Sequence, residues 1–171
     1  MITPLKALVL AVMAVLVVGV GTVSAADAPP VPTVHFVWMG GPDCPPCVGW
    51  RLFELPKLQK TAEFQAIKYH YVTKSISASV PPAFFMPDEL RPFKNKLDKA
   101  SGGGFGSPQA ALIVDGEVYD YFWGVRTAEE IEMMLKAVRT GSAYPFRRCV
   151  KMSSMGRACE IYVLQEEHAT K

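Results

Sequence analysis

Two cysteines separated by two prolines, in the motif Cys44-Pro45-Pro46-Cys47, place the strongest constraint on this chain. The preceding run Thr33–Met39 predicts a strand, and the apolar spacing from Val48 onward predicts a helix. Two cysteines at this spacing on the first turn of a helix can close a small disulfide ring and reopen it. The N–H groups at a helix start favour a thiolate, which is the form of cysteine that attacks another disulfide. The motif therefore predicts a site of thiol–disulfide exchange.

Residues 1–25 have the parts of a secretory signal peptide. Lys6 precedes the uncharged apolar run Ala7–Val23, and the small residues Ser24-Ala25-Ala26 fit cleavage after Ala25 or Ala26. An uncleaved anchor is the alternative, because the apolar run is just long enough to span a bilayer. Both interpretations predict an exported protein, periplasmic or similar, which contacts a membrane only through an uncleaved signal.

The part that follows the signal is about one domain long and can build a real core. Loss of residues 1–25 removes one positive charge and no negative charge, so the formal net charge falls from +2 to +1. This balance argues against nucleic acid as a partner. We expect a linker at 26–32, a domain at 33–141 and a C-terminal extension at 142–171.

The domain reads as strand, helix, strand, helix, hairpin, helix. Because a helix joins the first two strands, they should be parallel, and the hairpin adds an antiparallel pair. Pro56 should kink the first helix. The fold class is α/β, a mixed sheet flanked by helices. The later elements are a strand at Ala66–Thr73, a helix through Leu90, Phe93 and Leu97, hairpin strands Gln109–Val114 and Glu117–Phe122 joined by Asp115-Gly116, and a helix from the capping box Thr127–Glu130 to Gly141.

This order resembles the thioredoxin superfamily over about Thr33–Thr140, because the cysteine motif starts the first helix and Ser107-Pro108 leads into the hairpin. The resemblance implies a thioredoxin-like sheet, redox activity without a cofactor, and partners that are protein thiols or disulfides together with a redox partner protein. In that family the proline before the third strand is cis and lies against the cysteines. This role falls to Pro108, and Ser107 would offer its backbone to an extended substrate segment.

The expected chemistry assigns one step to each cysteine. Cys44, which is usually the accessible residue in such a motif, attacks, and Cys47 resolves the mixed disulfide. Asp43 opposes ionisation of Cys44 whereas the helix start favours it, so reductant, oxidant and isomerase all stay open. We expect no catalytic role for His35, His70 or His168, and no metal. Phe84, Phe85 and Phe105 are candidates for an apolar groove that binds unfolded chains.

The second cysteine pair lies in the C-terminal extension. Strand-like runs flank Ser153-Ser154, and a hairpin turning there would place Cys149 directly opposite Cys159, within disulfide range. We expect a structural disulfide, with a second redox pair as the alternative.

Three other functions compete with the oxidoreductase. The cysteines Cys44, Cys47, Cys149 and Cys159 could form a zinc module, although the spacing of the second pair fits poorly. A thioredoxin-like scaffold for envelope assembly would use the disulfide only structurally, and a metallochaperone would use the same cysteines. Oligomeric state and substrates are not given by the sequence.

Overall fold

The computed structural model describes residues 30–154 and 158–163, and the chain from Val31 onward forms one compact unit. The expected signal peptide and most of the expected linker lie outside the described residues, as do 164–171. The C-terminal extension therefore belongs to the same compact unit as the domain before it.

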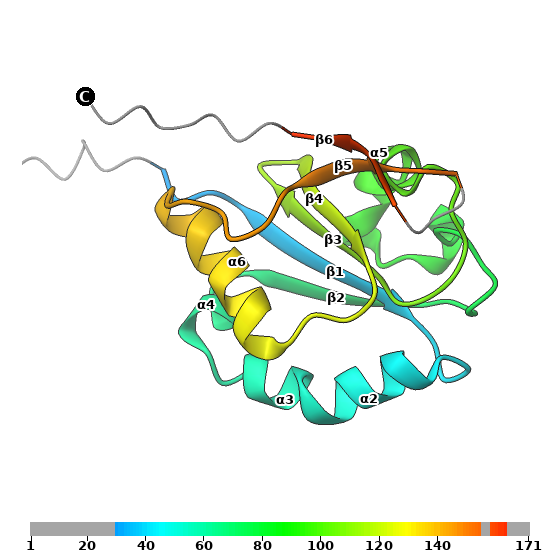
Figure 1. Ribbon diagram of the computed structural model, residues 1–171, viewed down its shortest axis with the longest axis horizontal. Helices are drawn as coiled ribbons and strands as arrows, with labels where there is room; N and C mark the ends of the chain where they lie inside the picture. The colour runs from blue at the N-terminus through cyan, green and yellow to red at the C-terminus, as the bar shows by residue number, and fades with distance from the viewer. Residues whose placement is uncertain (1–29, 155–157, 164–171) are drawn as a thin grey trace, which may run out of the picture. The chain divides into compact units, whose positions relative to one another are not determined.

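Four strands form the central sheet, in the order β2-β1-β3-β4 (Figure 1). β1 is parallel to β2 and antiparallel to β3, and β3 and β4 are antiparallel. Asp115 and Gly116 connect β3 to β4 with positive φ angles of 49° and 85°, as a two-residue hairpin turn requires. The mixed α/β sheet expected from the sequence is confirmed. The strand bounds are β1 Val34–Gly40, β2 Lys68–Thr73, β3 Gln109–Val114 and β4 Glu117–Trp123.

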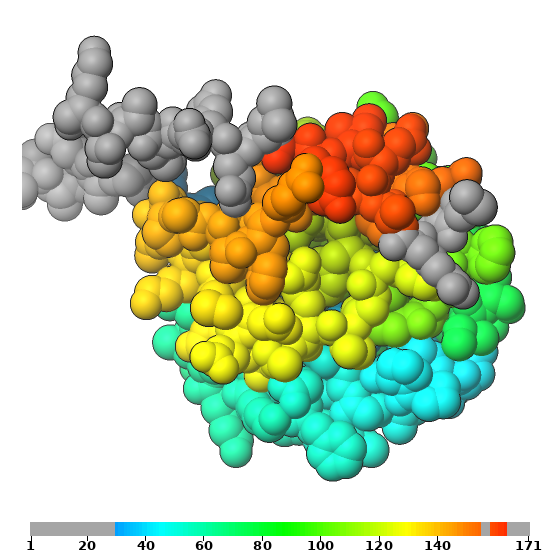
Figure 2. Space-filling model, viewed as in Figure 1, coloured from blue at the N-terminus to red at the C-terminus, as the bar shows by residue number. Residues whose placement is uncertain are grey.

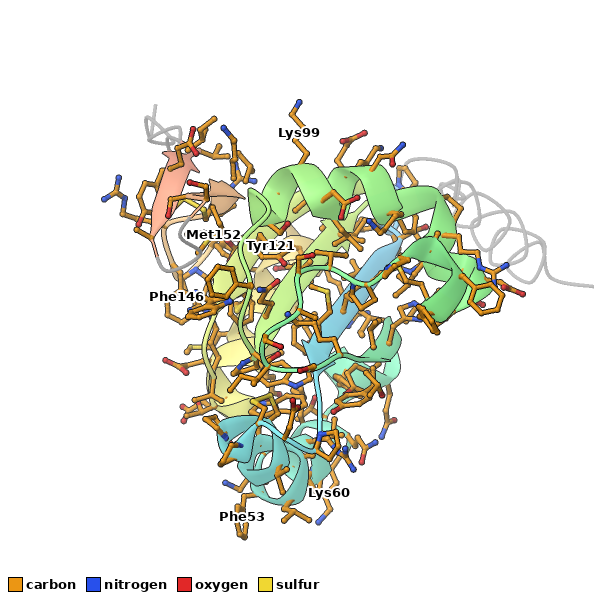
Figure 3. All side chains as sticks on the ribbon, turned by 90° about the vertical axis from the view of Figure 1, so that its right-hand side faces the viewer. Phe53, Lys60, Lys99, Tyr121, Phe146 and Met152 are labelled. Carbon is orange, nitrogen blue, oxygen red and sulfur yellow. A yellow bond between two sulfur atoms is a disulfide. The ribbon has the colours of Figure 1, made fainter. Side chains whose placement is uncertain are left out.

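Alternate residues of the strands supply two cores, one on each face of the sheet. Phe36 and Trp38 of β1 belong to the first core, whereas Val37 and Met39 belong to the second. Figure 3 shows α5, in green, and α2, in cyan, on opposite sides of the strands. The first face is covered by α2 (Pro45–Phe53), α3 (Leu55–Leu58), α4 (Ala62–Gln65) and α6 (Ala128–Thr140), and the second by the 3₁₀ helix Asp88–Phe93, α5 (Lys94–Ser101) and the C-terminal hairpin.

Local signals explain where the helices begin and end. α2 ends at Phe53 and α3 begins at Leu55, so the kink expected from Pro56 is a complete break two residues before it. Thr127 and Glu130 form the expected capping box, in which each side chain accepts a hydrogen bond from the other residue's backbone N–H. The short 3₁₀ helix Ala83–Phe85 precedes the longer one at Asp88–Phe93.

The C-terminal extension contains the hairpin of β5 (Cys149–Met152) and β6 (Cys159–Tyr162), which packs against β4 and α5 (Figure 1). The orange and red atoms of this hairpin are part of the surface seen in Figure 2. The expected disulfide Cys149–Cys159 is confirmed, with Cα atoms 5.7 Å apart. The expected register is wrong: Cys149 pairs with Tyr162, and Cys159 pairs with Met152. The reason is that the register shifts on both sides of Lys151, so the two cysteines are bonded without being directly opposed.

A buried carboxylate fastens this extension to the sheet. Asp120 of β4 is 1% exposed and accepts hydrogen bonds from the Tyr144 hydroxyl at 2.9 Å and from the Cys149 backbone N–H at 2.8 Å. Burial raises the pKa of Asp120, while both hydrogen bonds act in the opposite direction. The segment that follows α6 is thus held by the core through specific polar contacts.

Candidate functional site

The cysteine motif occupies the turn between β1 and α2. Cys44 is the N-cap residue of α2, the two prolines take the first helical positions, and Cys44 and Cys47 are disulfide-bonded with Cα atoms 5.2 Å apart. The prolines have no N–H, so the first N–H donor of the helix is that of Cys47. It is shared between two acceptors of Cys44, the carbonyl oxygen at 2.9 Å and Sγ at 3.3 Å. The helix start therefore directs this donor in part at the sulfur of Cys44 and not at that of Cys47.

Both cysteines are fully buried in this closed form, at 0% exposure, although Pro45 and Pro46 beside them are exposed. The expectation that Cys44 is accessible is therefore wrong for the disulfide state. Cys47 lies against the end of β1, where a Cβ atom built on Gly40 would stand 2.5 Å from Cys47 Sγ. The disulfide ring is buried against the end of β1, so its reaction with any thiol requires local opening of the structure around it.

Gly40 should be indispensable to this arrangement. In Gly40→Ala the new methyl group meets the Cys47 sulfur, so either β1 or the ring must shift. We expect a loss of about 1–3 kcal/mol in the free energy of unfolding of the oxidised protein, as for overpacked cores. Urea unfolding of the oxidised form measures it. Gly49→Ala on α2, where an added Cβ meets nothing within 4 Å, is the matched control and should lose no stability. Equal stability of the two variants would contradict the prediction.

The loop after β2 holds the cysteine turn in place. Lys74 N–H donates to Gly40 O at 3.1 Å, and the Asp43 carboxylate accepts from Ile76 N–H at 3.0 Å and Ser75 Oγ at 2.9 Å. The backbone hydrogen bond from Ile76, followed by that from Ser75, lowers the pKa of Asp43. Asp43 is thus an ionised residue whose charge is engaged by this loop.

Ser107 and Pro108 lie at the start of β3, beside the same end of β1, because Met39 pairs with Gln109. The Ser107–Pro108 peptide bond is cis, as the resemblance implied. Gly106 O, one residue earlier, accepts from Lys74 Nζ at 2.6 Å and from Gln109 Nε2 at 2.9 Å. The sheet register thus brings the loop carrying the two expected substrate-binding residues to the end of the sheet where the cysteine turn begins.

Lys74 joins the two loops, and sequence reasoning did not single it out. Its ammonium also donates to Ala78 O at 2.6 Å, and the residue is 5% exposed. Burial lowers the pKa of Lys74 to about 8, although Asp43 acts in the opposite direction. No sequence pattern marks this role, because both acceptors are backbone carbonyls in loops.

The buried ammonium predicts a pH effect on stability. From pH 8 to pH 10.5 folded Lys74 gives up its proton while unfolded Lys74 keeps it, so its contribution to stability increases as pH rises through this window. The free energy of unfolding of wild type relative to Lys74→Met should therefore rise by up to about 3 kcal/mol between pH 7 and pH 10. Urea unfolding at both values measures it. Lys99→Met, an exposed lysine on α5, is the control, and parallel pH profiles for wild type and Lys74→Met would contradict the prediction.

A mostly apolar pocket of about 810 Å³ adjoins the cis bond. Of the three expected groove residues only Phe105 lines it; Phe84 and Phe85 stack edge to face on each other and are exposed. Ser107 Oγ is buried and makes no hydrogen bond within the described part of the chain. The pocket lining is Ile76, Ser77, Phe105, Gly106, Ser107, Trp123 and Ser154.

The four cysteines form two separate disulfides, Cys44–Cys47 and Cys149–Cys159. They do not gather into one ligand cluster anywhere in 30–154 or 158–163. The four-thiolate zinc site is therefore not formed among these residues.

His35 and His70, which the sequence suggested were ordinary strand residues, contact each other through Nδ1 and Nε2 at 3.0 Å. Burial lowers the pKa of both, and Glu89 acts in the opposite direction. His35 is the second residue of β1, at the other end of that strand from the cysteine motif, and His70 of β2 pairs with Val37 in the middle of β1. His168 lies outside the described residues.

No protein-family model matches the chain, and no curated protein is significantly similar to it. Among the described residues, the helices are all too short or too polar to cross a membrane.

Proposed function

We propose that this protein is an exported thiol–disulfide oxidoreductase that exchanges disulfides with protein cysteines through Cys44 and Cys47. The observation that carries the proposal is the cysteine pair at the N-terminus of α2, at the same end of the sheet as a cis Ser107–Pro108 bond. The resemblance of these motifs and their order to the thioredoxin superfamily supports it. The apolar N-terminal run Ala7–Val23 and the small residues after it support export.

The roles of the two cysteines follow from the helix start. Cys44 Sγ is the sulfur at which Cys47 N–H points, and a donor at the positive end of a helix stabilises a thiolate. Cys47 Sγ is packed against Gly40, at the inner side of the ring. Cys44 therefore attacks the substrate and Cys47 resolves.

The exchange balances as two displacements at sulfur. The Cys44 thiolate attacks one sulfur of a substrate disulfide, forming a mixed disulfide and releasing the other substrate sulfur as a thiolate. The Cys47 thiolate then attacks Cys44 Sγ, which re-forms the ring and releases the second substrate thiolate. The substrate gains two electrons and the Cys44–Cys47 pair loses them, and the reverse sequence donates the disulfide to a dithiol.

The pocket beside Ser107 supports a polypeptide substrate. Its lining combines the apolar side chains of Ile76, Phe105 and Trp123 with Gly106 and Ser107, the two residues that precede Pro108. An extended segment with apolar side chains suits such a surface, because backbone contacts supply affinity and pockets supply preference.

A second candidate function is a binding scaffold in which the Cys44–Cys47 disulfide is only structural. The observation that favours it is the complete burial of both cysteines. The two functions make opposite predictions for the pair, since a structural disulfide resists equilibration with thiols and a catalytic one exchanges with them.

The decisive experiment is equilibration of the purified protein with glutathione buffers of defined potential. After rapid acid quenching and alkylation, peptide mass mapping separates Cys44–Cys47 from Cys149–Cys159. We expect Cys44–Cys47 to equilibrate reversibly while Cys149–Cys159 stays closed. A midpoint near ~−270 mV would identify a reductant and one near ~−120 mV an oxidant. A pair that does not equilibrate at any potential would overturn the oxidoreductase and leave the scaffold.

A further inference from the structure

A cluster of three ligand-type side chains lies on the second face of the sheet, away from the cysteine motif. His35 comes from β1, His70 from β2 and Glu89 from the 3₁₀ helix Asp88–Phe93. β1 and β2 are parallel, with Val37 opposite His70, so the two histidines are two residues apart in register on one face. One histidine per strand, separated by 35 positions, leaves no motif in the sequence.

The three ligand atoms converge on a small volume. His35 Nδ1 and His70 Nε2 are 3.0 Å apart, Glu89 Oε2 is 3.9 Å from His70 Nε2, and all three atoms lie within 4.8 Å of one another. The two imidazole planes are inclined to each other by 13°, and the ring centroids are 5.3 Å apart whereas the facing nitrogens are 3.0 Å apart. The rings therefore meet edge to edge. The two facing nitrogens thus point at each other as a hydrogen-bonded pair, with the carboxylate of Glu89 beside them.

Packing positions the histidines and leaves the third ligand free to move. His35 and His70 are 5% and 9% exposed, and the Phe93 ring meets His35 edge-on with centroids 5.1 Å apart. The Glu89 side chain is 58% exposed, so the cluster is open to solvent on the carboxylate side. An ion can enter from that side without disturbing the core.

We infer that His35, His70 and Glu89 form a binding site for a divalent first-row transition metal, with Zn²⁺ as the representative ion. Two imidazole nitrogens and one carboxylate oxygen are a donor set that zinc accepts, with the fourth position left to water. Two nitrogens bound to one tetrahedral zinc at ~2.0–2.1 Å lie about 3.3 Å apart. Metal binding therefore replaces the hydrogen bond between the histidines: the nitrogens separate by a few tenths of an ångström, both rings turn so that their lone pairs meet at the ion, and Glu89 swings toward them.

The charge of Lys68 allows the proposed role of Glu89 as a ligand to be tested. Its ammonium is 3.6 Å from Glu89 Oε2, and both side chains are more than half exposed. A positive charge beside the carboxylate competes with a cation for it, and an exposed ion pair of this kind holds the carboxylate only weakly. A metal bound at the cluster should thus bind more tightly when Lys68 loses its charge.

The experiment titrates Zn²⁺ into the full chain with both disulfides closed, using calorimetry, and adds Co²⁺ absorption spectra as a report on coordination geometry. We expect one equivalent of Zn²⁺ and a tetrahedral Co²⁺ spectrum. Affinity should rise by about fivefold in Lys68→Gln. In Glu89→Gln it should fall by roughly tenfold or more, since even outer-shell changes cost 10–100-fold. Glu117→Gln, another exposed glutamate paired with a lysine, is the control and should bind as wild type does.

His70→Asn completes the set, with circular dichroism to verify its fold; should it fail to fold, Glu89→Gln and Lys68→Gln still decide. Zn²⁺ should also raise the melting temperature of wild type and not that of Glu89→Gln. Absence of binding at a hundredfold excess of Zn²⁺, an affinity in Glu89→Gln equal to that of wild type, or an affinity that fails to rise in Lys68→Gln would each overturn the site.

Discussion

Cys44→Ser should abolish thiol–disulfide exchange, whereas Cys47→Ser should stop it after its first step. A serine hydroxyl does not ionise near neutral pH, so Cys44→Ser has no nucleophile at the sulfur position toward which Cys47 N–H points. Cys47→Ser keeps that nucleophile and lacks only the group that resolves the mixed disulfide. We expect turnover of a disulfide substrate such as insulin to fall to the uncatalysed rate in both variants.

The two variants differ in what accumulates. Cys47→Ser should form a stable mixed disulfide with the substrate, visible by non-reducing electrophoresis and mass spectrometry, and Cys44→Ser should form none. The double variant Cys149→Ser with Cys159→Ser is the matched control, because it removes a disulfide of the same protein outside the site; it should keep turnover. Trapping by Cys44→Ser in place of Cys47→Ser would reverse the assigned roles.

Asp120→Ala should cost about 3–6 kcal/mol in the free energy of unfolding, because two hydrogen bonds to a charged acceptor are lost at once. The substitution removes the carboxylate that accepts from the Tyr144 hydroxyl and the Cys149 N–H, at a position where Asp120 is 1% exposed. Native domains are typically stable by about 5–15 kcal/mol, so this is a large share of the total. Urea unfolding with both disulfides closed measures the loss.

Two further variants should lower the free energy of unfolding by smaller amounts. Tyr144→Phe removes one of the two donors and should cost about 1.5–3 kcal/mol, and Asp120→Asn keeps one side-chain oxygen as an acceptor and should fall between the others. A loss below about 1 kcal/mol in Asp120→Ala would mean that the C-terminal extension is not anchored through this carboxylate.

Local sequence patterns were sufficient for the strands of the central sheet and for α6, but not for α3, α4 or the two 3₁₀ helices. Alternation in Val34–Met39 identified β1, the Asp115-Gly116 pair identified the β3–β4 turn, and Thr127 with Glu130 identified the start of α6. Each of these signals acts within a few residues of the structure that it specifies. Connection rules applied to them gave the parallel pairing of the first two strands and the antiparallel hairpin, whereas the order of the strands in the sheet was not predicted.

The features that the sequence did not reveal depend on contacts between distant segments. The His35–His70 pair requires the parallel register of β1 and β2, and the role of Lys74 requires two loop carbonyls. The hairpin register was missed because shifts at Lys151 offset its strands.

The shielding of the Cys44–Cys47 ring has a kinetic consequence. Because both residues are fully buried when the ring is closed, a reducing agent meets the sulfurs only during excursions in which the surrounding loops part. The reduction rate should climb with reagent concentration and then reach a ceiling equal to the opening frequency. That ceiling is the same for every small thiol, so nucleophile strength ceases to matter there. A protein partner that opens the loops when it docks is not subject to this limit. The pair would then react faster with protein substrates than with small thiols, and this difference in rate would provide the selectivity.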